Sequence, residues 1–285
     1  MAKKALLVGI NAYPSAPLNG CVNDSRLMYN LLIQKLGFPP DNVRVLTDQR
    51  ATTQEIKNRL SWLFSGLKAG DTAVFHYSGH GSQVRDRGPL DELQDGLDEI
   101  ICPINFNWQQ LLITDDQLGA YLKLVPSGAR AYVVLDCCHA GTGTRELINP
   151  MSNNGPKPKN ARVRYLAPPF DLKARFIGRK LAKRKIGRGT TTASTKAVSG
   201  EIICLSMNHI LLAGCSEAQT SAEAWLGGQF NGALTWALAS ALTANISGTA
   251  VSQFQAIISK VKSRGFGQTP QLEGPQGLMS RPLFS

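Results

Sequence analysis

The stretch that decides the fold is ARAYVVLDCCHAGT, residues 129–142. Its apolar first half is typical of a buried strand, and that strand ends in Asp136, Cys137 and Cys138 before a loop of small residues. In an open parallel sheet, ligands bind beyond the carboxyl ends of the strands. The two adjacent thiols therefore raise the question of whether either is a nucleophile, and which.

Other segments repeat this alternation of buried strands and helices. Apolar runs at 4–10, 43–48, 71–80 and 209–216 are strand-like, whereas 23–36, 52–67, 113–125, 231–245 and 251–265 have apolar residues at helical spacing. Thr52 and Thr114 are expected to cap two of these helices, and a short last strand is expected near Gln271–Leu272. The pattern predicts an α/β fold with a mostly parallel sheet of six or more strands and helices on both faces.

Size and composition exclude several classes of protein. The chain has 285 residues, of which 43% are hydrophobic, but no apolar run approaches the length of a membrane span. The apolar start is too short for a signal peptide and is interpreted as the first strand, so a cytoplasmic location without membrane contact is expected. The six cysteines are then expected to be reduced, and their spacing does not fit a structural zinc site.

The net charge of +11 comes from one segment. Residues 157–196 contain thirteen Lys or Arg and one Asp, whereas the rest of the chain contains 18 basic and 19 acidic residues. Around this segment, 142–200 is rich in Gly, Pro, Ser and Thr and poor in core-forming residues. We therefore predict a large unit at 1–145, a basic flexible linker at 146–200 and a small unit at 201–285 that completes the same sheet.

A second strand end also carries reactive groups. The strand at 71–80 leads into HYSGHGS, in which Gly79 and Gly81 flank His80. If the two strands are parallel neighbours, His80 and one cysteine meet at one rim, where an imidazole lowers the pKa of a thiol and protonates a leaving amine. Cysteine at a strand end is more often a core residue, however. These residues alone leave a Cys-His enzyme and a structural explanation open.

The order of the motifs resembles that of the metacaspases and their prokaryotic relatives, the orthocaspases, in the caspase–haemoglobinase clan. The HYSGHGS motif is followed, 58 residues after His80, by Cys138 in DCCHAG, where the family has Asp-x-Cys-His-x-Gly. ALLVGINAYP, LNGCVNDS, DGLDEIICP, ITDDQL, LLAGCSEAQTSAE and NGALTWAL match other parts of the family pattern. The resemblance covers nearly the whole chain except the linker, and it implies a caspase-like three-layer sandwich.

The resemblance implies a cysteine endopeptidase with a Cys-His dyad. Cys138 would be the nucleophile and His80 the catalytic imidazole, and the amides of Gly81 and Cys138 would form the oxyanion hole. Because neighbouring strand residues point to opposite sides, Cys137 would face the core or support the pocket wall. No residue that orients the dyad can be named from the sequence.

The resemblance also places an acidic pocket at the residue before the scissile bond. Two carboxylates in a half-buried pocket favour a guanidinium, so the expected partners are peptide or protein substrates with Arg or Lys before the scissile bond. As alternatives, Asp24 could be an ordinary helix cap, and Asp136 a buried acid bonded to the backbone. The matching pocket positions are Cys21, Asp24, Ser78 and Asp136.

If the site binds Arg or Lys, the basic linker is itself a candidate substrate. A protease specific for Arg or Lys would meet tethered substrates at high effective concentration. We expect a zymogen that cuts itself between Lys173 and Arg188 into two subunits that stay associated, and a solvated charged loop is the alternative. The candidates for the residue before the cut are Lys173, Arg175, Arg179, Lys180, Lys183, Arg184, Lys185 and Arg188.

Many metacaspases need calcium, and the matching acids here are Asp95, Asp115 and Asp116, with Asp98 and Glu99 nearby. Such hard oxygen ligands suit calcium. The family often has an Asp about seven residues after the nucleophile, whereas this chain has Arg145 there, and a cation opposes metal binding. We therefore expect that no cofactor is required and that activity is independent of calcium; the Asp115–Asp116 pair could simply favour a helix dipole.

Two other classes of protein stay open at this point. A catalytically silent relative could serve as a scaffold or binding protein, although His80 and Cys138 are both present. A nucleic-acid-binding protein would explain the basic linker, but the near-neutral remainder of the chain argues against it. The resemblance favours a monomer, because metacaspases are usually monomeric.

Overall fold

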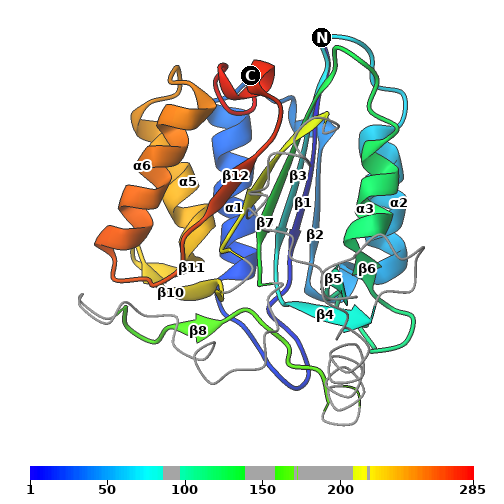
Figure 1. The fold of residues 1–285 in the computed structure, drawn as a ribbon, viewed down its shortest axis with the longest axis vertical. Coiled ribbons are helices and arrows are strands. Elements are labelled where there is room, and N and C mark those ends of the chain that lie inside the picture. The colour runs from blue at the N-terminus through cyan, green and yellow to red at the C-terminus, as the bar shows by residue number, and fades with distance from the viewer. Residues whose placement is uncertain (86–96, 139–157, 170–171, 173–207, 217–218) are drawn as a thin grey trace, which may run out of the picture.

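The computed structural model describes residues 1–85, 97–138, 158–169, 172, 208–216 and 219–285 (Figure 1). A six-stranded sheet forms its centre, with the strand order β12–β9–β7–β3–β1–β2. All neighbours are parallel except β12, which is antiparallel to β9. The strands are β1 (Lys3–Gly9), β2 (Val43–Thr47), β3 (Thr72–Ser78), β7 (Arg130–Asp136), β9 (His209–Ala213) and β12 (Gln271–Glu273). The predicted mostly parallel sheet is thus confirmed, and it includes strands from both ends of the chain.

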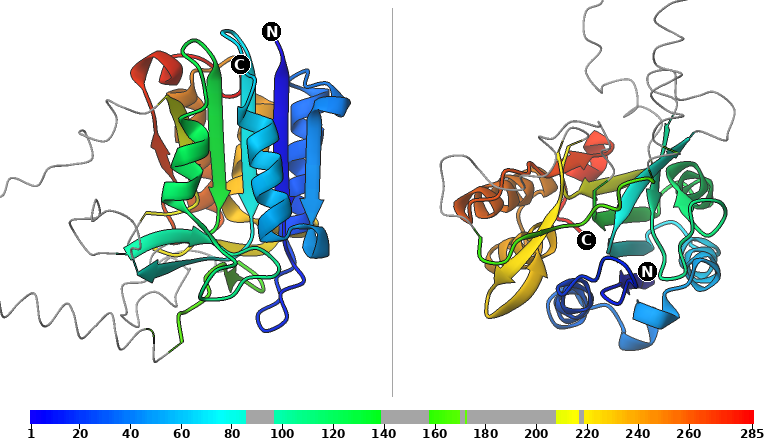
Figure 2. Two further views of the ribbon diagram at one scale, coloured as in Figure 1. Left: turned by 90° about the vertical axis from the view of Figure 1, so that its right-hand side faces the viewer. Right: turned by 90° about the horizontal axis from the view of Figure 1, so that it is seen from below.

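Helices cover both faces of this sheet. On one face lie α1 (Cys21–Gln34), α5 (Ala233–Ala244) and α6 (Ala250–Ser263), and on the other lie α2 (Thr53–Phe64) and α3 (Asp115–Leu122). Figure 2, left, shows α2 and α3 in front of the sheet. A short helix, α7 (Gln276–Met279), and two 3-10 turns, η1 (Pro40–Asn42) and η2 (Asp48–Arg50), complete the helical elements of the described residues.

The central strands are buried on both faces, which explains their continuous apolar sequence. On β1, Leu6 and Val8 join the core under α2 and α3, whereas Ala5 and Leu7 join the core under α1, α5 and α6. Two helices also begin at the capping residues that the sequence predicted. Thr52 Oγ1 accepts a hydrogen bond from the amide of Glu55 at 3.3 Å, and Thr114 Oγ1 accepts one from the amide of Gln117 at 3.1 Å.

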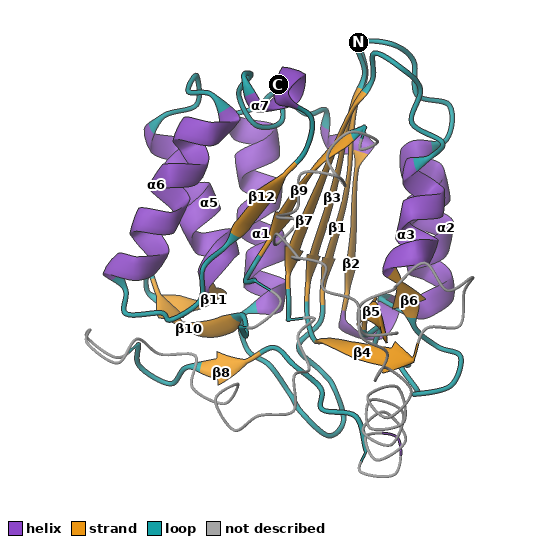
Figure 3. Cartoon of the chain, viewed as in Figure 1, coloured by secondary structure: helices purple, strands orange, loops and turns teal. Residues whose placement is uncertain are grey.

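Two small sheets, which the sequence pattern did not predict, lie beyond the carboxyl ends of the central strands (Figure 3). One has the order β4–β5–β6, and the other has the order β11–β10–β8. The strands are β4 (Gly81–Arg85), β5 (Leu97–Ile101), β6 (Ile113–Thr114), β8 (Arg162–Val163), β10 (Ala222–Leu226) and β11 (Gln229–Gly232). β8 falls inside the range predicted as the linker, so at least this part of that range pairs with the remainder of the fold.

Within the part of the chain that the structure describes, no helix combines the length and the apolar character that a membrane crossing requires.

Candidate functional site

The two reactive strand ends lie side by side. β3 and β7 are parallel neighbours, and their last residues, Ser78 and Asp136, are paired in register. His80 and Cys138 each follow two residues later, so both lie at the same edge of the sheet. Their side chains are buried, with 2% and 0% exposure.

The two adjacent cysteines face opposite sides of the sheet. Cys137 belongs to the core under α2 and α3, as expected for one of the pair. The Cys138 side chain lies against Ser221, with the sulfur 2.6 Å from the Ser221 amide nitrogen and 3.0 Å from its carbonyl oxygen. Cys138 is therefore the thiol that lies among the polar groups at the sheet edge.

The imidazole of His80 is held by a backbone carbonyl. Its Nε2 lies 2.7 Å from the carbonyl oxygen of Ala16, and since a carbonyl only accepts, Nε2 carries the proton. The Tyr13 ring packs on the imidazole with centroids 4.6 Å apart, and the Tyr13 hydroxyl accepts a hydrogen bond from the His80 amide at 3.1 Å. His80 Nδ1 is buried and has no hydrogen-bond partner among the described residues. That nitrogen is thus available to accept a proton.

Burial holds both groups of this pair in their neutral forms. Desolvation lowers the pKa of His80 to about 4, against the opposing effect of the Ala16 carbonyl. Desolvation also raises the pKa of the Cys138 thiol well above its ordinary value, and the neighbouring Cys215 raises this pKa further. The pair is a neutral thiol and a neutral imidazole in this conformation.

Two backbone amides converge on one carbonyl oxygen. The Gly81 amide lies 3.1 Å from the carbonyl oxygen of Arg164, and the Cys138 amide lies 3.2 Å from the same oxygen. These are the two amides that the family resemblance assigned to an oxyanion hole. Position 81 needs glycine, because a Cβ there would run into the Cys138 carbonyl. A carbonyl bound in this way lies between the two strand ends that carry His80 and Cys138.

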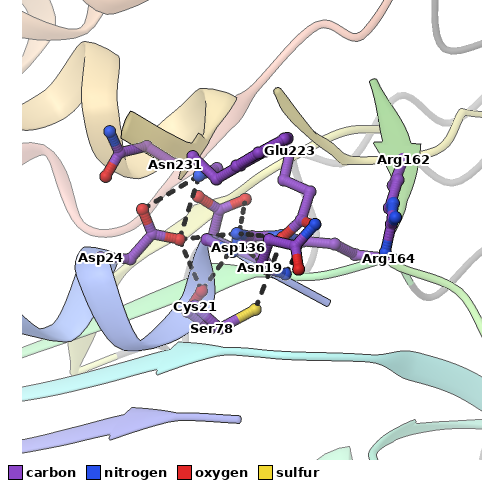
Figure 4. Close-up of polar contacts among 12 residues, drawn as sticks. Asn19, Cys21, Asp24, Ser78, Asp136, Arg162, Arg164, Glu223 and Asn231 are labelled. Carbon is purple, nitrogen blue, oxygen red and sulfur yellow. Dashed lines mark hydrogen bonds and ion pairs between the residues drawn. The ribbon is translucent and has the colours of Figure 1, made fainter. Parts of the chain in front are cut away.

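The side chain of Arg164 fills an acidic pocket next to this oxygen (Figure 4). Its guanidinium lies 2.7 Å from Asp24 Oδ2, 3.3 Å from Asp136 Oδ1 and 3.4 Å from Glu223 Oε2, and all four side chains are fully buried. The guanidinium also donates to Ser78 Oγ at 2.8 Å and to the Asp136 carbonyl at 3.1 Å. Three carboxylates thus surround one buried cation, which they hold through charge-assisted contacts.

Asp24 and Glu223 are also held by donors of the protein itself. Asp24 accepts hydrogen bonds from the Gly232 amide at 2.9 Å and from Ser78 Oγ at 2.7 Å. Glu223 accepts from the amides of Asn19 at 2.8 Å and Gly20 at 2.9 Å. These donors fix the carboxylates in place, so the pocket is preorganised for its cation.

Asp136 is anchored from the opposite side by α5. Its Oδ2 accepts from the amide of Thr235 at 2.8 Å and from the hydroxyl of Thr235 at 2.7 Å, and its Oδ1 accepts from Ser221 Oγ at 2.9 Å. The Thr235 hydroxyl also lies 3.0 Å from Nε2 of His76, whose pKa burial lowers to about 4. The amino end of α5 thus fixes one wall of the pocket.

The charge of the pocket depends on pH through Asp24. Burial raises the pKa of Asp24 to about 6; the Arg164 guanidinium opposes this rise, and Asp136 adds to it. Since the bound guanidinium lowers this pKa, a pocket without it would hold Asp24 at a still higher pKa.

The structure gathers the four predicted pocket residues in one place. Asp24, Ser78 and Asp136 contact the guanidinium directly, whereas Cys21 lies behind them, with its sulfur 4.0 Å from Glu223 Oε2. Two members of the cluster were missed, Glu223 and Arg164. A signal existed for Glu223, which is a single acid within the apolar stretch AEAWL of a buried strand.

Several predicted residues lie outside the described residues. They are Asp95, Arg145 and all the expected processing positions, Lys173, Arg175, Arg179, Lys180, Lys183, Arg184, Lys185 and Arg188. Self-cleavage between Lys173 and Arg188 therefore stays a prediction.

The expectation about calcium also stays a prediction. Among the described residues, no three His, Cys, Asp or Glu side chains gather as a metal site would require. Asp115 and Asp116 lie in the first turn of α3, where Asp115 Oδ1 accepts a hydrogen bond from the Asp116 amide at 3.0 Å. Asp95 lies outside the described residues, so the full donor set is not tested and no chemical step is assigned to the ion.

Comparisons with known proteins identify the family and the fold. The model of the metacaspase, peptidase C14 domain, matches residues 3–145. Metacaspase-1 of Cryptococcus neoformans var. neoformans serotype D is 29% identical over 304 residues, which cover 99% of this chain but 64% of the fungal protein. The chain thus spans less than two thirds of that relative's length.

Two solved structures share the fold. A crystal structure of protein GSU0716 from Geobacter sulfurreducens matches with a TM-score of 0.68 at 24% identity and covers 100% of this chain and 99% of that one. The structure of caspase-1 from Spodoptera frugiperda matches with a TM-score of 0.51 at 10% identity and covers 96% and 87%. These likenesses confirm the caspase-like α/β fold.

Thr235→Val tests how the pocket wall is anchored. The change removes a hydroxyl donor from Asp136 and the partner of His76 Nε2, both buried, so we expect the free energy of unfolding to fall by about 1–3 kcal/mol in urea denaturation. Thr243→Val on the same helix is the matched control, because the exposed Thr243 hydroxyl only donates to the Ala239 carbonyl. Its effect should stay within about 0.5 kcal/mol. Equal effects of the two changes would contradict the anchoring.

Proposed function

This chain belongs to the metacaspase family of C14 peptidases, and from that premise we propose that it is a cysteine endopeptidase that cleaves after Arg or Lys. Cys138 and His80 are its dyad, and the pocket of Asp24, Asp136 and Glu223 binds the side chain before the scissile bond. The observation that carries the proposal is the position of Arg164. Its guanidinium lies among the three carboxylates, while its carbonyl oxygen accepts hydrogen bonds from the Gly81 and Cys138 amides.

The proposed reaction begins with proton transfer from the Cys138 thiol to Nδ1 of His80. The sulfur then attacks the carbonyl carbon after the basic residue, and the developing oxyanion is stabilised by the amides of Gly81 and Cys138. His80 returns the proton to the leaving amine as the C–N bond breaks, which leaves a thioester on Cys138. Water adds to the thioester, His80 takes its proton, and the new carboxylate and the free thiol are released.

The Ala16 carbonyl supports this exchange by fixing the ring. Because its oxygen accepts the Nε2 proton at 2.7 Å, the neutral imidazole keeps its lone pair at Nδ1. When Nδ1 is also protonated, the same carbonyl favours the cation. Tyr13, whose ring packs at a tilt with its centroid 4.6 Å from that of the imidazole, restricts rotation of the ring. Ala16 and Tyr13 therefore position His80 and do not react themselves.

A small peptide amide with Arg before the reporter group tests the proposal directly. Wild type should hydrolyse it, and Cys138→Ala should lower kcat/KM by at least about 1,000-fold, because the nucleophile is removed. Cys137→Ala is the matched control, since that thiol lies in the core, and it should stay within about threefold of wild type. A reporter with Asp in place of Arg should not be cleaved. Equal hydrolysis by Cys138→Ala and wild type would show that another group is responsible. No hydrolysis by either protein would show that the chain is a scaffold.

The pocket should lose affinity for cations as pH falls. The pKa of Asp24 is about 6 with a guanidinium bound and higher without one. Cation binding is therefore complete above the higher pKa of the empty pocket and weakens as pH falls from that value towards about 6, because Asp24 must lose a proton for the cation to bind. The inhibition constant of a small guanidinium compound such as agmatine should rise at least about tenfold from pH 7.5 to pH 5. Asp24→Asn is the control and should show weak binding that changes less than about threefold over this range. A wild-type inhibition constant that is the same at both pH values would contradict this assignment.

A further inference from the structure

Arg164 does more in this structure than neutralise buried acids. Its guanidinium is bound by the three carboxylates, and its backbone is bound by groups of the same site. Its carbonyl oxygen accepts from the amides of Gly81 and Cys138, and its own amide donates to the Ser221 carbonyl at 3.0 Å. One residue thus occupies the basic pocket and the oxyanion position at the same time.

The residues on both sides of Arg164 run through the site as an extended peptide. Before it, β8 pairs antiparallel with β10, with Val163 opposite Ala222 and Arg162 opposite Glu223. After it, the amide of Leu166 donates to the Gly81 carbonyl at 3.0 Å, and Ser82 Oγ lies 2.5 Å from the Leu166 carbonyl oxygen. Strand addition of this kind is a common mode of peptide recognition.

This segment, residues 162–166, covers the dyad. Cys138 is fully buried and His80 is 2% exposed, although both lie at the edge of the sheet. The Arg164 backbone carbonyl is close enough to the imidazole to favour its charged form, although burial and the Arg164 guanidinium lower the pKa of His80 more strongly. No external peptide can reach the pocket while the Arg164 guanidinium fills it.

We propose that the peptide bond between Arg164 and Tyr165 is a self-cleavage site, cut by Cys138 of the same molecule, and that residues 162–166 keep the site closed until they leave it. The inference rests on the proposed endopeptidase activity. The proposed cut lies upstream of the range 173–188, in which the sequence analysis predicted self-cleavage. The reason is that Arg164 is the basic residue whose carbonyl lies at the dyad.

The chemistry of the step is that of the general reaction. The Cys138 sulfur bonds to the carbonyl carbon of Arg164, the bond to the Tyr165 nitrogen breaks, and the thiol proton reaches that nitrogen through His80. The chain then ends in a thioester at Arg164 and begins anew at the amino group of Tyr165. Water hydrolyses the thioester to the Arg164 carboxylate and restores the thiol.

Sequencing of the fragments tests the position of the cut. Freshly prepared full-length chain is incubated, and the new N-termini are identified by mass spectrometry. We expect a fragment that begins at Tyr165, formed at a rate that does not change over about 50-fold dilution, because the bond is already in its own site. Cleavage confined to 173–188, or a rate that rises in proportion to concentration, would overturn the inference.

Variants separate Arg164 from its neighbours. Arg164→Gln should slow the cut after residue 164 by at least about 100-fold, because the guanidinium contacts are lost. Arg162→Ala is the matched control, since that exposed side chain only donates to the Pro17 carbonyl at 3.1 Å, and its cut should stay within about threefold of wild type. Tyr165→Pro keeps the guanidinium and its ion pairs but should block the cut, so the test holds even if Arg164→Gln folds poorly. Unchanged cleavage in Tyr165→Pro would contradict the assignment.

The Arg-amide reporter distinguishes failure of this inference from failure of the proposed function. Wild type should hydrolyse the reporter after a lag that matches the appearance of the Tyr165 terminus, and Arg164→Gln should show no such lag. Reporter hydrolysis that depends on Cys138 but begins at once in uncut wild type would overturn the inference and leave the proposed function intact. Reporter hydrolysis that is the same in Cys138→Ala would overturn both.

Discussion

The structure depends on one buried guanidinium among three buried carboxylates. Asp24 comes from α1, Asp136 from the end of β7 and Glu223 from β10, so the pocket draws on the first, middle and last parts of the chain. Carboxylates this close repel one another, and Asp136 adds in this way to the burial that raises the pKa of Asp24. Removing the cation from a buried cluster of this kind costs about 3–5 kcal/mol, because uncompensated charge remains. The folded structure is therefore more stable with a cation bound between these three carboxylates.

The contact between a guanidinium and the three carboxylates serves both the proposed binding of substrate and the proposed closure of the site by residues 162–166. The Arg164 guanidinium lies among the carboxylates while its carbonyl oxygen lies at the Gly81 and Cys138 amides. In the proposed mechanism, a peptide that supplies the cation is oriented for cleavage by the same pair of contacts. When the chain's own segment supplies it, the dyad is dehydrated and both Cys138 and His80 are held neutral. Exposure of the pair to water removes that penalty, so departure of residues 162–166 favours the charged, reactive forms of the thiol and the imidazole.

Much of this could be read from the sequence, for identifiable reasons. Continuous apolar strands alternating with amphipathic helices predict the layered sheet, and the two motifs at the strand ends predict that His80 and a cysteine lie at one edge of it. The Ala16 carbonyl could not be predicted, because a backbone group leaves no trace in residue type. Glu223 is 199 residues from Asp24 in the chain, so only tertiary structure brings the two together. Arg164 is one of thirteen basic residues in the segment 157–196, so its type alone does not distinguish it. The strand β8, which directly precedes it, has only two residues and is too short to give a periodic sequence pattern.

The most direct test of the central claim is a crystal structure of the full-length chain carrying Cys138→Ala, which cannot cut itself by the proposed route. The account predicts residues 162–166 along β10, with the Arg164 guanidinium between Asp24, Asp136 and Glu223 and its carbonyl oxygen at the amides of residues 81 and 138. An ordered pocket without Arg164, with residues 162–166 following another path, would contradict it.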